Sequence, residues 1–218
     1  FAMSQPIAGT LAAVYLRGRG ITAVHAFPAL RFHPRCFVRP EDDGPTETWP
    51  AIIASVTDLA DVQTGAHRTW LARDGSDKAP IIPPRKAMGD LLGHAVRFGR
   101  AADVLAAGEG IETVLSVREV LPGLPAAAAL SANHLAAILF PPTLRRLYIL
   151  RDRGAAGDMT ETVLTERAAA AGIEAVTLAP ALGDFNNDLC DFGADALQAR
   201  LRAELVAEAA ARSSPAED

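Results

Sequence analysis

Carboxylates follow three separate apolar runs of the sequence, each at the point where the run ends. The runs and their acids are Val104–Ala107 with Glu109, Leu147–Leu150 with Asp152, and Ala175–Leu178 with Asp184 and Asp188. If these runs are parallel strands, their carboxyl ends meet at one edge of a sheet, where ligands bind. Carboxylate oxygens suit Mg²⁺, which keeps waters and substrate phosphates among its ligands. The pattern therefore indicates a metal site for phosphate chemistry, with a solvated acidic loop as the alternative for each acid.

The elements that must position these acids alternate between strand and helix from residue 101 onward. A further apolar run, Ala126–Leu130, lies between the first two acidic motifs. Helical patterns follow the runs at Glu112–Leu121, Asn133–Phe140 and Asp158–Ala171, and a last one spans 194–211. Consecutive strand–helix units predict an α/β fold with a parallel sheet flanked by helices.

The first hundred residues carry less regular patterns and many prolines. Residues 6–20 favour a short helix that ends at glycines, whereas residues 21–50 show little periodicity. The apolar, β-branched stretch Ala51–Val56 predicts a strand. Its hairpin partner would be His67–Ala72, across a turn near Thr64-Gly65. This section therefore favours a small β-rich subdomain.

Charge is unevenly distributed along the chain. The first 100 residues carry 12 Lys/Arg and 9 Asp/Glu, a net charge of +3, although they include a predicted acidic loop at Glu41–Glu47. The remaining residues carry 9 Lys/Arg and 17 Asp/Glu, a net charge of −8, so the whole chain has a net charge of −5. A basic part that could face phosphates thus precedes an acidic part that could hold cations. Cys36 and Cys190 have no spacing typical of a disulfide framework or a zinc site. Neither a membrane span nor a signal peptide is predicted, so we expect a cytoplasmic protein with no membrane partner.

Three motifs resemble those of the Toprim domain, which bacterial primases, topoisomerases and some nucleases share. They are AAGEGIETVLS at 106–116, LYILRDRGAAG at 147–157 and GDFNNDL at 183–189. The resemblance implies a Toprim domain, with a Rossmann-like parallel sheet, over residues 101–198. Residues 199–218 would then be the end of a C-terminal helix and a disordered tail.

Shorter stretches of the front part are similar to Toprim proteins of phages and plasmids, and so to the catalytic core of bacterial primase. They are YLRGRGI at 15–21, LRFHP at 30–34, HRTWL at 67–71 and PPRKAMG at 83–89. The resemblance implies that residues 1–100 form a small basic α+β subdomain, rich in β-strands, that helps to bind template and nucleotide.

The same resemblance implies roles for individual side chains. Glu109 would be the general acid/base and, with Asp152 and Asp184, a ligand of Mg²⁺ or Mn²⁺, and Asp188 would be a further ligand. Nucleic-acid phosphates would contact basic residues, namely Arg31, Arg68, Arg85, Lys86 and Arg153. Arginine suits two-pronged phosphate contacts, although a solvated surface position is the alternative for each arginine.

Two positions depart from the Toprim motifs. Gly154 stands where the second motif of the family has another Asp, and Asn187 stands where many relatives have an Asp in the third motif. The loss of two negative charges should weaken cation binding, more so for a two-metal than for a one-metal arrangement. Asp158 could compensate, but we predict that it caps the following helix. Glu112 is predicted to lie in the first turn of its helix.

Three functions remain open from these motifs. The first is primase-like nucleotidyl transfer in the replication or transfer of mobile-element or plasmid DNA. Such an enzyme would act on nucleoside triphosphates along single-stranded DNA or RNA, and a helicase or relaxase would be the partner to look for. The second is a non-catalytic, degenerate Toprim module that only binds nucleic acid. The third is a Toprim nuclease that uses the same acids.

Overall fold

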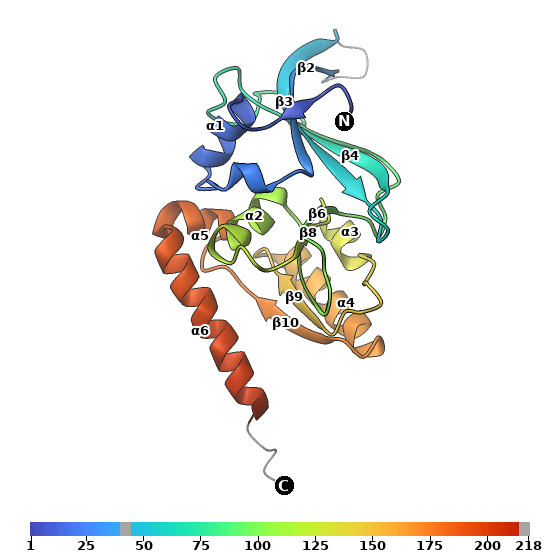
Figure 1. The fold of residues 1–218 in the computed structure, drawn as a ribbon, viewed down its shortest axis with the longest axis vertical. Helices are drawn as coiled ribbons and strands as arrows, with labels where there is room; N and C mark the ends of the chain where they lie inside the picture. The colour runs from blue at the N-terminus through green and yellow to red at the C-terminus, as the bar shows by residue number, and fades with distance from the viewer. Residues whose placement is uncertain (40–44, 214–218) are drawn as a thin grey trace.

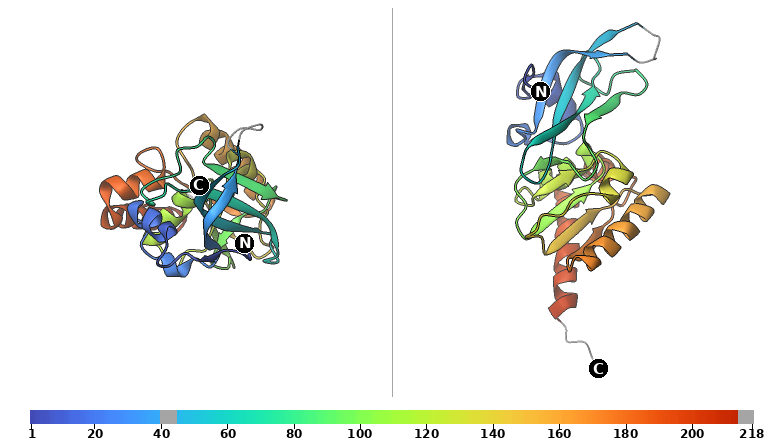
Figure 2. Two further views of the ribbon diagram at one scale, coloured as in Figure 1. Left: turned by 90° about the horizontal axis from the view of Figure 1, so that it is seen from above. Right: turned by 90° about the vertical axis from the view of Figure 1, so that its right-hand side faces the viewer.

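The computed structural model describes residues 1–39 and 45–213 and arranges them around two sheets (Figure 1). The sheets lie one beyond the other along the long axis of the molecule, the N-terminal one uppermost (Figure 2). Most of the predicted acidic loop at Glu41–Glu47 lies outside the described residues, and so do the tail residues 214–218.

The N-terminal sheet is antiparallel, and its strands are ordered β1-β2-β3-β4-β5. Helix α1 (Leu11–Gly18) contacts β2 and β3 and buries Tyr15 and Leu16. A 3₁₀ turn, η1 (Val24–Ala26), leads from α1 into the sheet. The β-rich front part predicted from the sequence is therefore present. The strands are β1 (Gln5–Pro6), β2 (Leu30–Val38), β3 (Glu47–Thr57), β4 (Gln63–Trp70) and β5 (Arg85–Gly89).

Strand β2 is an element that the sequence patterns did not predict. Pro34 hides the strand signal, because proline cannot donate to a sheet ladder and is tolerated only at edges and bulges. The structure accommodates it with a register shift between His33 and Cys36 against β3. The irregularity breaks the alternation of side chains that would have marked the strand.

The turn between β3 and β4 also differs from the prediction. Thr64 and Gly65 lie inside β4, and the chain turns earlier, around Asp61, which has a φ of 62°. The carboxylate of Asp58 accepts hydrogen bonds from the backbone N–H groups of Ala60 and Val62, at 2.8 and 2.9 Å. This side-chain hydrogen bonding, and no glycine, makes the turn.

The C-terminal sheet has the order β10-β9-β7-β8-β6. Four of these strands run parallel, and β6 pairs antiparallel with β8 at one edge. The prediction of an α/β fold with a parallel sheet is confirmed, with this antiparallel edge strand as an addition. The strands are β6 (Val96–Phe98), β7 (Val104–Gly108), β8 (Ala126–Ala128), β9 (Arg146–Leu150) and β10 (Glu174–Leu178).

Helices cover both faces of the C-terminal sheet, since its strands are apolar on both sides. On β7, Leu105 packs into a core with Leu164 of α4, whereas Ala106 packs into another core with Val114 of α2 and Leu197 of α6. Successive side chains thus point to opposite helical layers. One layer holds α2 (Ile111–Val120), α5 (Phe185–Phe192) and α6 (Ala194–Ser213), and the other holds α3 (Ala132–Ala136) and α4 (Ala155–Ala170).

Three helices depart from their predicted limits. Helix α3 is shorter than the predicted Asn133–Phe140, and α5 was not predicted because it has only eight residues, half of them polar. Helix α4 begins at Ala155, so its N-cap is Gly154 and the prediction that Asp158 caps it is wrong. Asp158 instead lies in the first turn and pairs with Arg151 at 2.8 Å.

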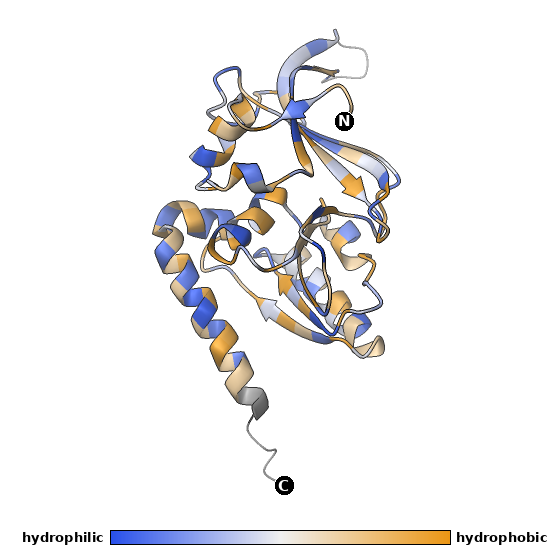
Figure 3. Cartoon of the chain, in the orientation of Figure 1, coloured by the Kyte–Doolittle hydropathy of each residue, from blue (hydrophilic) through white to orange (hydrophobic). Residues whose placement is uncertain are grey.

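The two parts of the chain share one hydrophobic core. Tyr15 and Leu16 of α1 and Ile52 of β3 belong to the same buried cluster as Val114 of α2 and Leu189 of α5. Apolar residues of α2 lie at the junction in Figure 3, while hydrophilic residues recur along α6 where it extends beyond the body. No helix within the described ranges has the length and apolar character that a membrane span requires.

Candidate functional site

Four acidic and three basic side chains line one cavity of about 210 Å³ where the two parts of the chain meet. Each acid belongs to the C-terminal part and each base to the N-terminal part. The cavity therefore sets carboxylates opposite cations across the junction. The acids are Glu109, Glu112, Asp152 and Asp184, and the bases are Arg19, Lys78 and Arg85.

The predicted acids reach this cavity because each follows the carboxyl end of a parallel strand. Glu109 comes directly after β7, Asp152 comes two residues after β9, and Asp184 follows β10 as the N-cap of α5. All three line the cavity. Neighbouring parallel strands thus bring together side chains that are up to 75 positions apart in the sequence.

Burial and electrostatic repulsion act together on the carboxyl of Asp152. Burial, together with the charges of Asp184 and Glu109, raises its pKa to about 6. The hydroxyl of Thr113 donates a weak hydrogen bond to Asp152 Oδ1 at 3.4 Å, which opposes the rise. The site thus concentrates negative charge that a bound cation would relieve.

The oxygens do not, however, meet at a single point. Within the described residues, no three His, Cys, Asp or Glu side chains lie close enough together to hold one metal ion. The expectation that Glu109, Asp152 and Asp184 share one ion is therefore not met by the side chains as they lie. The donors remain chemically suited to Mg²⁺, because it takes hard oxygens and completes its shell with waters and phosphates. Their mutual repulsion at Asp152 is the observation that fits such an ion.

Glu112 is a site residue that the sequence prediction placed correctly on α2 but did not assign to the site. Tyr15 donates a hydrogen bond to its Oε1 at 2.7 Å, and Lys78 Nζ lies 3.1 Å from the same atom. Burial alone would raise the pKa of Glu112, but Lys78 and Tyr15 outweigh it and lower the pKa to about 2. Glu112 is therefore the anion that ties the two parts together at the cavity. Its place in the first acidic motif, three residues after Glu109, was the available signal.

The bases of the cavity come from three segments of the front part. Arg19 follows α1 and pairs with Asp77 at 2.7 Å, Lys78 comes from the loop after β4, and Arg85 begins β5. Only Arg85 was predicted. Arg19 belongs to the stretch YLRGRGI, whose resemblance to primase-like proteins implies no role for this residue, and Lys78 lies in no recognisable motif.

The antiparallel register separates the other predicted bases from the cavity. Arg31, Ile53 and Arg68 are partners across β2, β3 and β4, so their side chains share one face. Arg85 is the partner of Thr69, one position along, and shares the opposite face with it. Arg31 donates to the Ser4 carbonyl at 3.1 Å, and the Arg68 guanidinium lies 5.0 Å from the Trp70 ring centroid. Both fill local structural positions away from the acids.

Two more predicted residues lie outside the cavity lining. Asp188 is fully buried and accepts hydrogen bonds from the backbone N–H groups of Ala181 and Leu182, at 2.8 Å each, and from Arg200. It therefore holds the loop before α5 against α6. Arg153 is exposed, and its Nε donates to the Pro180 carbonyl at 3.0 Å.

The two departures from the motifs have local structural reasons. Asn187 completes a capping box with Asp184, in which Asp184 Oδ1 accepts from the Asn187 N–H at 2.7 Å and Asn187 Oδ1 accepts from the Asp184 N–H at 3.2 Å. Gly154 has φ 112° and ψ 171°, a conformation that residues with a side chain rarely adopt. The backbone at position 154 is thus built for glycine and not for a second carboxylate.

A second cavity of about 430 Å³ adjoins the first and shares Lys78, Arg85 and Leu130 with it. Lys86, His67 and His134 also line it, and no acidic residue does. Burial lowers the pKa of His67 to about 4, so this ring is neutral at neutral pH. The combined space therefore passes from an acidic end to a basic end.

Comparisons with known proteins bear on both parts of the chain. A family model described as a Toprim domain matches residues 104–195, and one described as a domain of unknown function (DUF7146) matches residues 1–98. No curated protein matches the chain.

Several solved primase structures share the fold. The Aquifex aeolicus primase fragment with zinc-binding and RNA polymerase domains matches with a TM-score of 0.63 and 17% identity over 93% of this chain, which spans only 57% of that fragment. The primase fragment of the bacteriophage T7 primase-helicase protein matches with a TM-score of 0.53 and 12% identity, over 89% of this chain and 72% of that fragment. The RNA polymerase domain of Mycobacterium tuberculosis primase DnaG, solved with a DNA oligomer, matches with a TM-score of 0.53 and 15% identity. The match covers 90% of this chain and 75% of that chain.

Proposed function

We propose, from the premise that residues 104–195 form a Toprim domain, that this chain carries out Mg²⁺- or Mn²⁺-dependent chemistry on nucleic-acid phosphates. The reaction we propose is primase-like nucleotidyl transfer, in which the 3′ oxygen of one nucleotide attacks the α-phosphate of a nucleoside triphosphate and pyrophosphate leaves. The observation that carries the proposal is the single cavity in which strand-end carboxylates face Arg19, Lys78 and Arg85.

The acidic end of the cavity supplies the groups for proton transfer and for a cation. Asp152 and Asp184 would hold a divalent ion together with waters and substrate phosphates, and that ion would offset charge on the phosphoryl group. The Glu109 carboxylate has no hydrogen-bond partner within the described part of the chain, so it is free to take the proton of the attacking hydroxyl. This availability supports Glu109 as the general base.

The basic end would bind the phosphates of the substrate. Lys78 and Arg85 line both cavities, and Lys86 extends the positive lining beyond them. Cations in a partly enclosed site orient a triphosphate or a strand and stabilise developing charge. The change from acidic to basic lining therefore supports a substrate that carries several phosphates in a row.

The biological setting is a finer part of the proposal. The front-part motifs resemble those of phage and plasmid Toprim proteins, and this supports a role in the replication or transfer of mobile-element or plasmid DNA. A helicase or relaxase would then deliver single-stranded template. Supplying single-stranded DNA and single-stranded RNA in turn as the template of the primer-synthesis assay measures which of the two the chain uses.

Primer synthesis on single-stranded templates tests the activity. The wild-type chain, supplied with Mg²⁺ or Mn²⁺ and labelled nucleoside triphosphates, should extend products, and Glu109→Gln should reduce the rate at least 100-fold, the contribution typical of a positioned general base. Asp158→Asn is the matched control, since Asp158 is an acid of the same domain outside the cavity. Incorporation that survives Glu109→Gln, or equal loss in Asp158→Asn, would contradict the assignment.

A second candidate function is binding without catalysis. Two observations favour it: the backbone at Gly154 excludes the usual second acid, and no three acids in the described residues lie within reach of one ion. In this case calorimetry should show oligonucleotide binding with no Mg²⁺ dependence and no incorporation. Metal-dependent nicking of plasmid that Asp152→Ala abolishes would instead indicate the nuclease.

A further inference from the structure

Arg97 of β6 carries buried donors that nothing in the described residues satisfies. Its Nε and Nη2 are shielded from solvent and have no hydrogen-bond partner. Burial lowers the pKa of this guanidinium, and the charges of Asp61 and Asp58 only oppose that effect from a distance. Shielded N–H donors without hydrogen bonds are costly, so Nε and Nη2 of Arg97 need acceptors from a ligand or an ordered water.

The surroundings of Arg97 form a cavity of about 300 Å³, separate from the acidic one. Arg100 adds a second cation to its lining, and Ser55 and Thr57 add hydroxyl groups. The Thr57 hydroxyl is also buried without a partner. Asp61 is the single acid in the lining, and it is exposed. The cavity therefore offers unused donors and a net positive charge.

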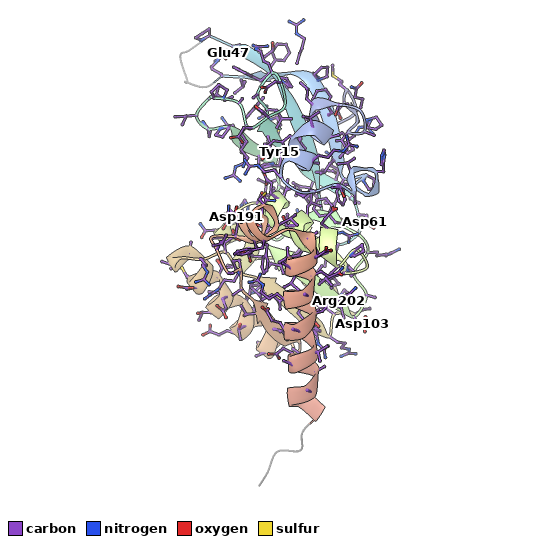
Figure 4. The ribbon with its side chains drawn as sticks, turned by 90° about the vertical axis from the view of Figure 1, so that its left-hand side faces the viewer. Tyr15, Glu47, Asp61, Asp103, Asp191 and Arg202 are labelled. Atoms are coloured by element: carbon purple, nitrogen blue, oxygen red, sulfur yellow. The ribbon has the colours of Figure 1, made fainter. Side chains whose placement is uncertain are left out.

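The Arg97 cavity is separate from the acidic site. Figure 4 shows Asp61 at the junction of the two parts on one side and Asp191, on α5, on the opposite side. Asp61 lines the Arg97 cavity, whereas α5 begins next to Asp184 of the acidic cavity. No residue lines both cavities.

Arg118 of α2 shows how this chain satisfies a comparable guanidinium. Its Nη1 donates to the carbonyls of Phe98 and Leu124, and its Nη2 donates to the carbonyl of Pro122 at 3.1 Å, although its Nε also lacks a partner. Arg118 thus acts as a structural clamp between α2 and the neighbouring loops. Arg97, only one residue from Phe98, has no such carbonyls.

We propose that Arg97, with Thr57 and Arg100, forms a binding site for a phosphate group outside the acidic cavity. A guanidinium with two free N–H directions and a nearby hydroxyl matches the acceptor oxygens of a phosphate. The phosphate can come from a nucleic-acid strand that passes the junction or from a free phosphate or nucleotide. The site does not depend on catalysis at the acidic cavity.

Thermal unfolding in the presence of inorganic phosphate tests the site, because a ligand that binds only the folded chain raises its melting temperature. At about 100 times its Kd, phosphate should raise the Tm of the wild-type chain by about 5–10 °C relative to chloride of equal ionic strength. Arg97→Met should abolish this rise without lowering the Tm in chloride, because methionine replaces an unpaired charge with an apolar chain of similar length. Arg118→Met, the matched control, should lower the Tm in chloride and keep the phosphate-dependent rise.

Asp61→Asn separates phosphate binding from a direct pair between Asp61 and Arg97. If phosphate binds, removal of the neighbouring negative charge should tighten its binding several-fold and leave the Tm in chloride unchanged. If Asp61 is the true partner of Arg97 in solution, Asp61→Asn should instead lower the Tm in chloride, and this outcome overturns the proposal. A phosphate-dependent rise that persists in Arg97→Met overturns it as well.

Oligonucleotide titration distinguishes the two phosphate sources. For a strand phosphate, Arg97→Met should weaken single-stranded DNA binding and reduce the slope of log K against log salt by about 0.7–1. For a free phosphate, the strand affinity should stay the same while the response to inorganic phosphate is lost. If neither ligand responds to Arg97→Met, the site is refuted regardless of the result of the primer-synthesis assay.

Discussion

Asp152 is the residue whose environment most constrains the acidic cavity. Its carboxyl is partly buried beside Asp184 and Glu109, and its pKa is raised to about 6 from the ordinary 3.8. The folded chain therefore holds a proton there between pH 4 and pH 6 that the unfolded chain has lost. Since the folded state binds more protons in that range, its stability falls as the pH rises through it.

Substitution of Asp152 by Asn should remove this pH dependence. Below about pH 4 the variant and the wild type should have the same Tm, because the carboxyl is protonated in both states. Above pH 6 the variant should be more stable by a few degrees, since an amide has no buried charge and does not repel Asp184. Thermal melts from pH 3.5 to 7.5 measure the difference, with Asp158→Asn as the exposed control. Parallel curves for the wild type and Asp152→Asn would contradict the burial and repulsion described for this site.

Glu112 shows the opposite electrostatic behaviour. With Lys78 and Tyr15 as partners, its pKa is lowered to about 2, so its stabilising effect is present above about pH 4.5 and is lost as the pH falls towards 2. Glu112→Gln should lower the free energy of unfolding by about 1–3 kcal/mol at pH 7. Denaturant titration measures this, and Lys78→Met in the Glu112→Gln background should cost less than Lys78→Met alone. Additive losses would show that the two side chains do not pair.

Among the elements, the turn between β9 and α4 depends on a close approach between the backbone at Gly157 and the carbonyl group of Asp152. A Cβ atom on Gly157 would lie 1.9 Å from the carbonyl oxygen of Asp152, so only glycine lets the first turn of α4 pack there. Gly154, at the N-cap, needs its φ of 112°. The two glycines of LYILRDRGAAG therefore shape the backbone that presents Asp152, and contribute no chemistry of their own.

Gly157→Ala should displace Asp152 and destabilise the chain. We expect a loss of about 2 kcal/mol or more in the free energy of unfolding, because backbone and not a flexible side chain must move. Gly123→Ala is the control, since its added Cβ would meet nothing within 4 Å, and it should change stability by no more than about 0.5 kcal/mol. Chemical denaturation and the pH profile of Asp152 together report the effect. An unchanged Tm in Gly157→Ala would refute the close approach.

In the molecule as a whole, the two sheets are joined by a common core and by the contacts of Glu112 with Tyr15 and Lys78. Tyr15 and Leu16 pack with Val114 and Leu189, and Tyr15 also donates to Glu112. The acids of the site lie in one part and the bases in the other. The cavity is therefore complete only when both parts are folded against each other.

A fragment of residues 101–218 should therefore lose much of its stability. Without α1, the buried faces of α2 and α5 become exposed apolar surface, which costs about 25 cal/mol for each square ångström. We expect the full chain to unfold in one cooperative transition and the fragment to bind a hydrophobic dye and unfold over a broad range. Calorimetry and dye binding measure both. A fragment with a sharp transition at the Tm of the full chain would show that the two parts fold independently, as the predicted boundary near residue 100 would allow.

Local sequence patterns predicted the four parallel strands of the C-terminal sheet and the acids that follow three of them, but not β6 or α5. Apolar runs, glycines and prolines mark the strands and helices, and an acid at the end of a parallel strand must lie at the ligand edge of its sheet. Glu109, Asp152 and Asp184 therefore reach the cavity as predicted.

Which bases face those acids, and how the acids are spaced, depends on the packing of segments that are distant in the sequence. Strand register places the side chains of Arg31 and Arg68 on one face of the N-terminal sheet and that of Arg85 on the other. Local composition does not predict the register at a bulge such as the one after His33. Lys78 and Arg19 reach the site from loops, across sequence distances that periodicity does not encode. The distances between the acids and the bases of the cavity depend on how the two parts of the chain pack, because the acids come from one part and the bases from the other.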